Sequence, residues 1–237
     1  MTAARTLIVN ADDFGRSAGI NAGIMRAHLE GLVTSTSLMV RWPAAATAAQ
    51  LARGCPRMSL GLHLDLGESA FRDGEWRAVY EVVDATDAQA VEREARAQLE
   101  RFRVLVGVDP THVDSHQHVH RGGAVAAVVD ELARPLGLPV RDRHPRIAYR
   151  GDFYGRTGTG DLLHDAITVD SLLALLRGLA PGITELGCHP GENDGADPLY
   201  AEERELELRA LCDARVRRVV RELGIALCSF AEVRAGL

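Results

Sequence analysis

Lysine is absent from the sequence, so all 27 basic residues are arginine, and the 33 acidic residues give the chain a formal net charge of −6 at pH 7. No block of basic residues interrupts the chain, which argues against nucleic acid as a partner. Cysteine is scarce, and the four cysteines show no CxxC spacing. Scattered thiols of this kind are typical of reducing compartments, so we expect a cytoplasmic protein.

Long apolar runs are also missing, since none approaches the roughly 20 residues of a membrane-spanning helix. The N-terminal segment MTAARTLIVNADDF lacks the apolar core of a signal peptide and leads directly into a β-forming run. The motif GxGxxG does not follow the first expected strand, and GxxxxGKS/T does not occur anywhere. The common dinucleotide and nucleotide fingerprints are therefore absent.

The composition that remains is ordinary for a globular protein, with 46% hydrophobic and 25% charged residues. A chain of 237 residues is long enough for one substantial core or two small ones. Because no linker-like stretch divides it, we predict a single domain, residues 1–237. The assembly state stays open, with a homodimer as one outcome.

β-forming runs alternate with helical patterns along the chain. Expected strands cover residues 6–10, 35–40, 59–64, 111–115, 138–141, 184–188 and 225–229. Expected helices cover residues 18–30, 43–53, 87–106, 123–136, 170–179 and 201–223, with a polar loop around DGEW and a Gly-rich loop at 142–165. This alternation predicts an α/β fold with about seven parallel strands, because parallel neighbours need crossover helices. A (β/α) barrel, closed or nearly so, and an open doubly wound sheet both fit the pattern.

Polar side chains gather where the expected strands end. They are Asp12 and Asp13 after the first strand, His63 in the third, Asp114, Ser115 and His116 in the fourth, Arg141 in the fifth and His189 after the sixth. In a parallel barrel the carboxyl ends of all strands open onto one face, where active sites lie. Taken singly, the two aspartates fit a turn and His63 fits a packed core histidine. Their joint occurrence at strand ends favours a site.

A cluster of histidines stands out at residues 111–121, THVDSHQHVHR, which holds four of the nine histidines. If the strand continued, alternate residues would share one face: His112, Asp114, His116, His118 and His120. Not all of these side chains can reach one ion. We expect His116, where the strand should end, to be the best placed.

The residue types predict metal chemistry. One carboxylate and two imidazoles form a ligand set that leaves positions open for water and substrate, as hydrolytic Zn²⁺ or a similar divalent ion requires. Two adjacent aspartates suit the same chemistry, because one can bind the ion while the other accepts a proton from water acidified by it. The sequence does not distinguish Mg²⁺ from Zn²⁺.

Five motifs in order, VNADDFG, TSTSLMV, GLHLDL, THVDSHQHVH and CHPG, strongly resemble the YdjC/ChbG-like carbohydrate deacetylase family, and they run from Val9 to Gly191. The resemblance implies a (β/α)-barrel-like fold, one divalent metal ion and hydrolysis of N-acetyl groups from amino sugars. It places the metal on Asp13, His63 and His116 and makes Asp12 the catalytic base. One position departs from the common pattern SHHHVH. Here it is Gln117, which on a strand would point away from His116 with little consequence.

The remaining polar residues receive roles as hypotheses. We expect Asp114, His118 and His120 to orient the ligands or face the substrate, and His112 to be structural. His189 is the candidate general acid, because imidazole titrates near neutral pH; otherwise it is a turn residue. Arg141 would orient Asp12 and lower its pKa, unless it forms only a surface salt bridge.

Two rival functions stay open. A metal-dependent phosphoesterase or amidohydrolase on a similar barrel often carries an HxH pair on the first strand, whereas here that strand carries two aspartates. A non-catalytic metal- or sugar-binding protein would not need Asp12 beside Asp13. For an enzyme, we expect a small N-acetylated sugar or sugar conjugate as substrate. Aromatic residues make up only 5% of the chain, so a long sugar-stacking groove is not indicated.

Overall fold

The computed structural model describes residues 4–234, so the predicted single domain extends beyond the described residues at both ends. Seven parallel strands form one sheet: β1 (Arg5–Phe14), β2 (Ser35–Leu38), β3 (Ser59–Leu64), β6 (Val113–Ser115), β7 (Ile147–Arg150), β8 (Gly182–Cys188) and β9 (Ile225–Leu227). Their order is β6-β3-β2-β1-β8-β7, and β9 pairs with the start of β1. This sheet confirms the predicted α/β, barrel-like fold. Among the described residues no ladder joins β6 to β7, so the barrel is incomplete.

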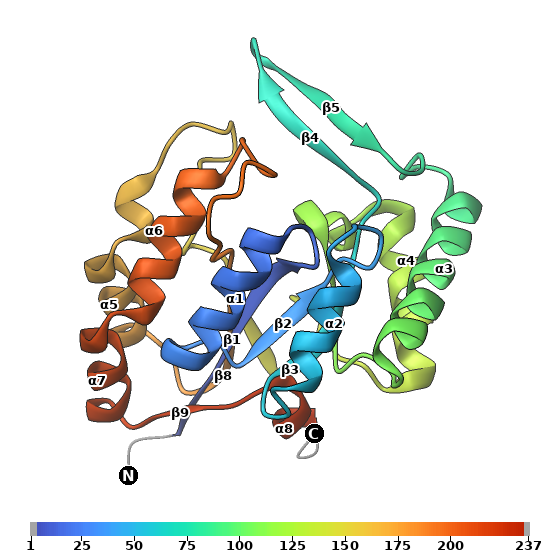
Figure 1. Ribbon diagram of the computed structural model, residues 1–237. Helices are drawn as coiled ribbons and strands as arrows, with labels where there is room; N and C mark the ends of the chain where they lie inside the picture. The colour runs from blue at the N-terminus through green and yellow to red at the C-terminus, as the bar shows by residue number, and fades with distance from the viewer. Residues whose placement is uncertain (1–3, 235–237) are drawn as a thin grey trace.

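Helices pack around this sheet (Figure 1). They are α1 (Ala18–Glu30), α2 (Ala45–Arg53), α3 (Ala88–Val106), α4 (Gly123–Ala133), α5 (Val169–Arg177), α6 (Ala201–Cys212), α7 (Ala214–Glu222) and α8 (Phe230–Arg234), with short 3-10 segments η1 (His116–Arg121), η2 (Arg134–Leu136) and η3 (His164–Ile167). In Figure 1, α3 and α4 lie to the right, beyond β3, and α5, α6 and α7 lie to the left of the strands. No described helix is both long enough and apolar enough to cross a bilayer.

The central strand β1 shows why the sheet carries its polar residues at one end. Leu7, Ile8 and Val9 have no exposed surface, as expected for a strand covered on both faces. Their burial fixes the strand in the interior, and its last residues emerge at the carboxyl edge. Asp12 and Asp13 are thereby placed at the end of the sheet beside the neighbouring strands.

Two predicted elements were wrong. The expected strand at 138–141 contributes only one parallel bridge, from Val140 to Val113. Pro139 has no N–H to extend the ladder towards residue 138, and Asp142, with φ of 57°, turns the chain after Arg141. The expected helix at 201–223 is interrupted at Asp213, whose side chain accepts the N–H of Arg215 and caps α7 as a separate helix.

Two segments predicted as loops also contain strands. β7 lies inside the expected Gly-rich loop and pairs with β8. The segment around DGEW forms an antiparallel hairpin of β4 (Gly67–Arg72) and β5 (Glu75–Glu81). Asp73 and Gly74 at its tip have φ of 53° and 83°, the left-handed turn that a two-residue hairpin favours. This β4–β5 arm projects away from the body of the protein (Figure 1).

Candidate active site

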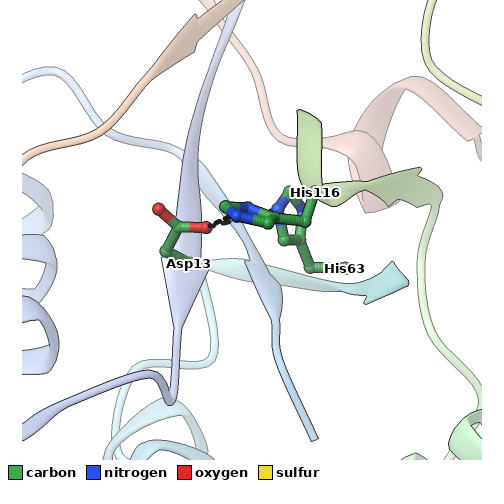
Figure 2. A group of neighbouring side chains, drawn as sticks. All are labelled: Asp13, His63 and His116. Atoms are coloured by element: carbon green, nitrogen blue, oxygen red, sulfur yellow. Dashed lines mark ion pairs between the residues drawn. The ribbon is translucent and has the colours of Figure 1, made fainter. Parts of the chain in front are cut away.

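Asp13, His63 and His116 converge from the ends of β1, β3 and β6 (Figure 2). Their ligand atoms all lie within 4.8 Å of one another. Asp13 Oδ1 is 3.4 Å from His63 Nε2 and 3.2 Å from His116 Nδ1. This buried oxygen accepts no hydrogen bond of good geometry. One orphaned carboxylate oxygen facing two imidazole nitrogens fits a divalent cation.

Asp13 is held in place by its backbone and by a second contact. Its φ of 67° lies in the left-handed region, which aspartate tolerates better than most residues, and Gly15 follows with φ of 94°. The guanidinium of Arg204, from α6, contacts Asp13 Oδ2 and also lies 2.6 Å from Asp197. Although burial opposes ionisation, Arg204 and the two histidines keep the pKa of Asp13 well below its ordinary value. Asp13 is therefore an anion with only Oδ1 left to bind a cation.

His63 is oriented by the carboxylate behind it. Its Nδ1 lies 2.7 Å from Asp114 Oδ1, while Asp114 Oδ2 accepts a hydrogen bond from Ser37 Oγ at 2.9 Å. This arrangement turns Nε2 towards Asp13, as in the carboxylate–imidazole pairs that support metal ligands. Burial opposes protonation, yet Asp114 raises the pKa of His63 to about 10. A proton and a metal ion would compete for the same nitrogen.

His116 receives its support from the β4–β5 arm. Its Nε2 lies 3.6 Å from Glu68 Oε2, and Arg16 forms an ion pair of 2.8 Å with the same carboxylate. Glu68 and Arg16 are both buried, with side-chain exposures of 7% and 6%. Sequence reasoning missed Glu68, because the arm had been interpreted as a polar loop.

Asp12 makes a bidentate ion pair with Arg141, at 2.6 Å and 2.7 Å. Arg141 is 1% exposed, so the surface salt bridge considered from the sequence does not fit its position. The same guanidinium lies 2.8 Å from Asp114 and 2.6 Å from Glu185. Burial favours the neutral acid at Asp12, but Arg141 lowers the pKa of Asp12 below its ordinary value.

Glu185, on β8, is a buried residue of the site that the sequence analysis missed. Its burial, together with the nearby charges of Asp114 and Asp12, raises its pKa to about 7 despite the opposing effect of Arg141. Three carboxylates face one guanidinium, so a retained proton on Glu185 relieves their repulsion. The signal in the sequence was a single charged residue inside the otherwise uncharged strand GITELGC.

His189 lies across from Asp12, with 3.8 Å between His189 Nε2 and Asp12 Oδ2. Behind the ring, Glu207 accepts the backbone N–H of His189 and lies 3.7 Å from its Nδ1. Glu207 is fully buried and also accepts a hydrogen bond of 2.8 Å from Tyr200. The aspartate and histidine therefore face each other with a buried carboxylate on the far side of the imidazole.

The other histidines do not share one face, so that prediction was wrong. β6 ends at Ser115, and Gln117 and His118 adopt φ of 50° and 55°, which redirects the chain. His120 is buried, with Nδ1 2.6 Å from Ser115 Oγ and Nε2 3.1 Å from the Arg141 carbonyl. His118 lines a cavity with its Nε2 3.3 Å from the Tyr149 hydroxyl.

His112 lies below the site. Its ring stacks on Phe230 at 3.9 Å between centroids, and its Nε2 is 2.9 Å from Asn10 Oδ1. Burial lowers the pKa of His112 to about 4, so the ring is neutral at physiological pH. Its contacts are those of a packed, hydrogen-bonded core residue.

Gln117 connects the site to the arm. Its Oε1 accepts the Ser69 N–H at 2.9 Å, and its Nε2 donates to the Ser69 carbonyl at 2.7 Å. The expectation that Gln117 would have little consequence assumed a strand, whereas the residue has φ of 50° in η1 and contacts the arm. The amide pairs with the β4 backbone as a neighbouring strand would.

A cavity of about 860 Å³ opens over these groups. Its inner wall includes Asp12, Asp13, His63, His116 and His189, and its outer wall includes residues of the β4–β5 arm. All residues predicted as metal ligands, base and acid thus face one space. Asp114 and Arg141 lie behind that wall and contact its residues, and His120 contacts the carbonyl of Arg141.

The curved parallel sheet and its carboxylates and imidazoles at the strand ends define a (β/α)-barrel-like protein with a candidate metal site. The chain belongs to the YdjC-like protein family, whose model matches residues 6–222. A carbohydrate deacetylase from Geobacillus stearothermophilus is 36% identical over 96% of this chain and 98% of its own length. A chitooligosaccharide deacetylase from Klebsiella pneumoniae is 34% identical over 97% of this chain and 99% of its own length.

Solved structures show the same fold. A protein from Enterococcus faecalis, named for cellobiose-phosphate cleavage, matches with a TM-score of 0.79 and 26% identity, covering 98% of this chain and 99% of that one. A family 4 carbohydrate esterase from Streptomyces lividans matches with a TM-score of 0.56 over 96% of this chain and 93% of its own. At 14% identity, the second likeness concerns the fold alone.

Proposed function

We propose that this protein is a carbohydrate deacetylase that hydrolyses an N-acetyl group on an amino-sugar-containing substrate, with the help of one divalent metal ion. The observation that carries the proposal is the convergence of Asp13, His63 and His116 beside the facing pair of Asp12 and His189. Relatives that match almost the whole chain and bear the name carbohydrate deacetylase support it.

Asp13, His63 and His116 would hold the ion, Mg²⁺ or Zn²⁺. A bound divalent cation supplies Lewis acidity, which polarises a carbonyl and makes water easier to deprotonate. Asp114 and Glu68 hold the two imidazoles in the orientation that this requires.

Asp12 acts as the general base. Arg141 holds its carboxylate as an anion, and an ionised carboxylate has about four acceptor positions, so the ion pair leaves room for a water proton. Water adds to the acetyl carbonyl as Asp12 takes its proton. His120 contributes indirectly, because its Nε2 contacts the carbonyl of Arg141 and fixes that residue.

His189 acts as the general acid. Breakage of the C–N bond leaves an amine that needs a proton, and His189 Nε2 faces the same part of the cavity as Asp12. The proton passes to the amine, and acetate and the free amino sugar are the products. Glu207 lies 3.7 Å from Nδ1 behind the ring and accepts the backbone N–H of His189, which holds the imidazole in place. His118 and Tyr149 line the cavity nearby and are positioned to bind substrate.

The test is acetate release from N-acetylated sugars by chelator-treated protein, with and without added Mg²⁺ or Zn²⁺. We expect turnover that depends on the metal and is lost in Asp12→Asn. Binding of sugar or metal without acetate release, over a broad panel of N-acetylated sugars, would instead identify a binding protein.

A further inference from the structure

The β4–β5 arm carries an aromatic pair outside the core. Phe71 and Trp76 are directly opposite each other in the hairpin, with ring centroids 5.6 Å apart and ring planes at 68°. Trp76 is 57% exposed. Because both rings line the cavity and lie outside the core, they are available to a bound ligand.

The base of the arm is fastened to the active site by two contacts. Glu68 pairs with Arg16 at 2.8 Å, and Gln117 makes two hydrogen bonds to the backbone of Ser69. Both contacts lie next to His116. Glu68 itself contacts His116, and Gln117 is the residue that follows it. The position of the aromatic pair is therefore set relative to the candidate metal site.

One cavity extends from the metal-site residues to the aromatic pair. Asp13 and His116 line its inner end, and Phe71 and Trp76 line the arm side. The loop of residues 157–160 reaches the arm, where Gly160 lies close to Phe71, and this loop lines the same cavity. At about 860 Å³ the cavity is at the upper end of the range for small-molecule sites, about 300–1,000 Å³. A single N-acetylated sugar ring leaves part of this space unfilled.

We propose that Trp76 and Phe71 form a distal subsite, which binds the apolar face of a second pyranose ring attached to the N-acetylated sugar. The proposal rests on the deacetylase function proposed above and names the residues that would bind a second sugar ring. A substrate of two or a few linked sugars would place its acetamido group at Asp13, His63 and His116 and its next ring at the arm.

The chemistry around the pair favours a sugar over a fatty chain. A pyranose has a C–H face that packs on an aromatic ring and an edge of hydroxyl groups that need hydrogen-bond partners. Arg72 and the backbone of Gly158 lie on the same cavity wall and offer such partners. An acyl chain would need an enclosed apolar channel, whereas Trp76 is mostly in water.

The subsite accommodates one sugar ring and does not form a long groove. The other aromatic side chains on the cavity wall, Tyr149, Tyr154 and Tyr200, lie beside His118 and His189 at the inner end. Trp42, the second tryptophan, contacts Arg16 and Asp65 at the base of the arm. This distribution agrees with the small number of aromatic residues in the sequence.

The experiment compares N,N′-diacetylchitobiose with N-acetylglucosamine. Binding is measured by calorimetry in metal-loaded Asp12→Asn protein, which avoids turnover, and KM and kcat are measured in the active enzyme. We expect Trp76→Ala to weaken disaccharide binding and raise its KM by about 5- to 20-fold, in line with the loss of one aromatic packing contact. Monosaccharide binding and kcat should stay within about twofold of the values for the parent protein.

Two matched variants keep the outcome interpretable. Val79→Ala removes an exposed side chain from β5 of the same arm, outside the cavity wall, and should change neither sugar. Trp76→Phe keeps a flat ring and should retain most of the disaccharide affinity, and circular dichroism checks that each variant is folded. Equal losses for both sugars, no loss for either, or no disaccharide binding by the parent protein would overturn the subsite. Tight, Trp76-dependent binding without any acetate release would leave the subsite standing and overturn the deacetylase function.

Discussion

Arg141 contacts both oxygens of Asp12, at 2.6 Å and 2.7 Å, from a position with almost no exposure to water. The pair holds the proposed base ionised and fixes the direction of its carboxylate. Because Arg141 also contacts Asp114, the same guanidinium links the base to the group that orients His63. The base and the candidate metal site are thus parts of one buried network.

Replacing Asp12 by Asn should abolish most turnover while leaving the metal bound. The amide has nearly the shape of the carboxylate but cannot accept a proton, and a general base is typically worth about 10²–10⁴-fold in rate. Arg141 would keep Asp114 and Glu185 as partners, so the fold should survive. The measurements are kcat and metal content of the purified variant. A kcat close to the parent value would remove Asp12 from the mechanism.

The predicted ligands can be tested by metal analysis. His63→Ala and His116→Ala should each lose bound metal and activity, because each removes one of three donors. His112→Ala is the matched control from the same stretch of sequence, since His112 packs on Phe230 below the site. This control should lower the melting temperature but retain metal. Full metal occupancy in His116→Ala would refute the ligand set.

A role of His189 as general acid predicts a selective defect. An amine leaves only after protonation, whereas the phenolate of an aryl acetate leaves readily without it. His189→Ala should therefore lose far more activity on the N-acetyl sugar than on the aryl ester, and the basic limb of its pH–rate profile should move or flatten. Both substrates are assayed over a range of pH. Equal losses would assign His189 to substrate positioning.

Stability should depend on pH through Glu185. Its folded pKa of about 7 exceeds the ordinary value of 4.5, so the folded protein binds this proton more tightly than the unfolded chain does. The resulting stabilisation is fully present below about pH 4.5 and is lost as pH rises to about 7, with a slope of at most ~1.4 kcal/mol per pH unit. Urea unfolding of the parent and Glu185→Gln at several pH values isolates this contribution. Curves that stay parallel between pH 5 and 7 would contradict it.

The sequence predicted the inner half of the site better than its surroundings. Asp12, Asp13, His63 and His116 follow directly from the ends of strands, because parallel strands bring those positions to one edge whatever the loops do. Glu68 and Glu207 reach the site from a hairpin and from a helix, and no local pattern fixes how either element is placed on the sheet. The packing between distant segments decides their role.

The sequence did contain a signal for one of the elements that was missed. Asp73-Gly74 between β-forming residues is a strong signal for a two-residue hairpin, and treating DGEW as a loop ignored it. The left-handed residues after Ser115 were harder to predict, because a histidine-rich run carries no marker that a strand ends and a tight 3-10 segment begins. For this reason, the prediction that the four histidines share one face was wrong.

His116 and Gln117 are consecutive residues, yet one faces the candidate metal site and the other fastens the arm. One peptide bond therefore links a predicted metal ligand to one of the two contacts that hold the arm. The outer wall belongs to a hairpin that pairs with no strand of the main sheet among the residues described. If the arm binds substrate as proposed, changes in the length or tip of that hairpin would alter which molecules are accepted and would need no change to the barrel.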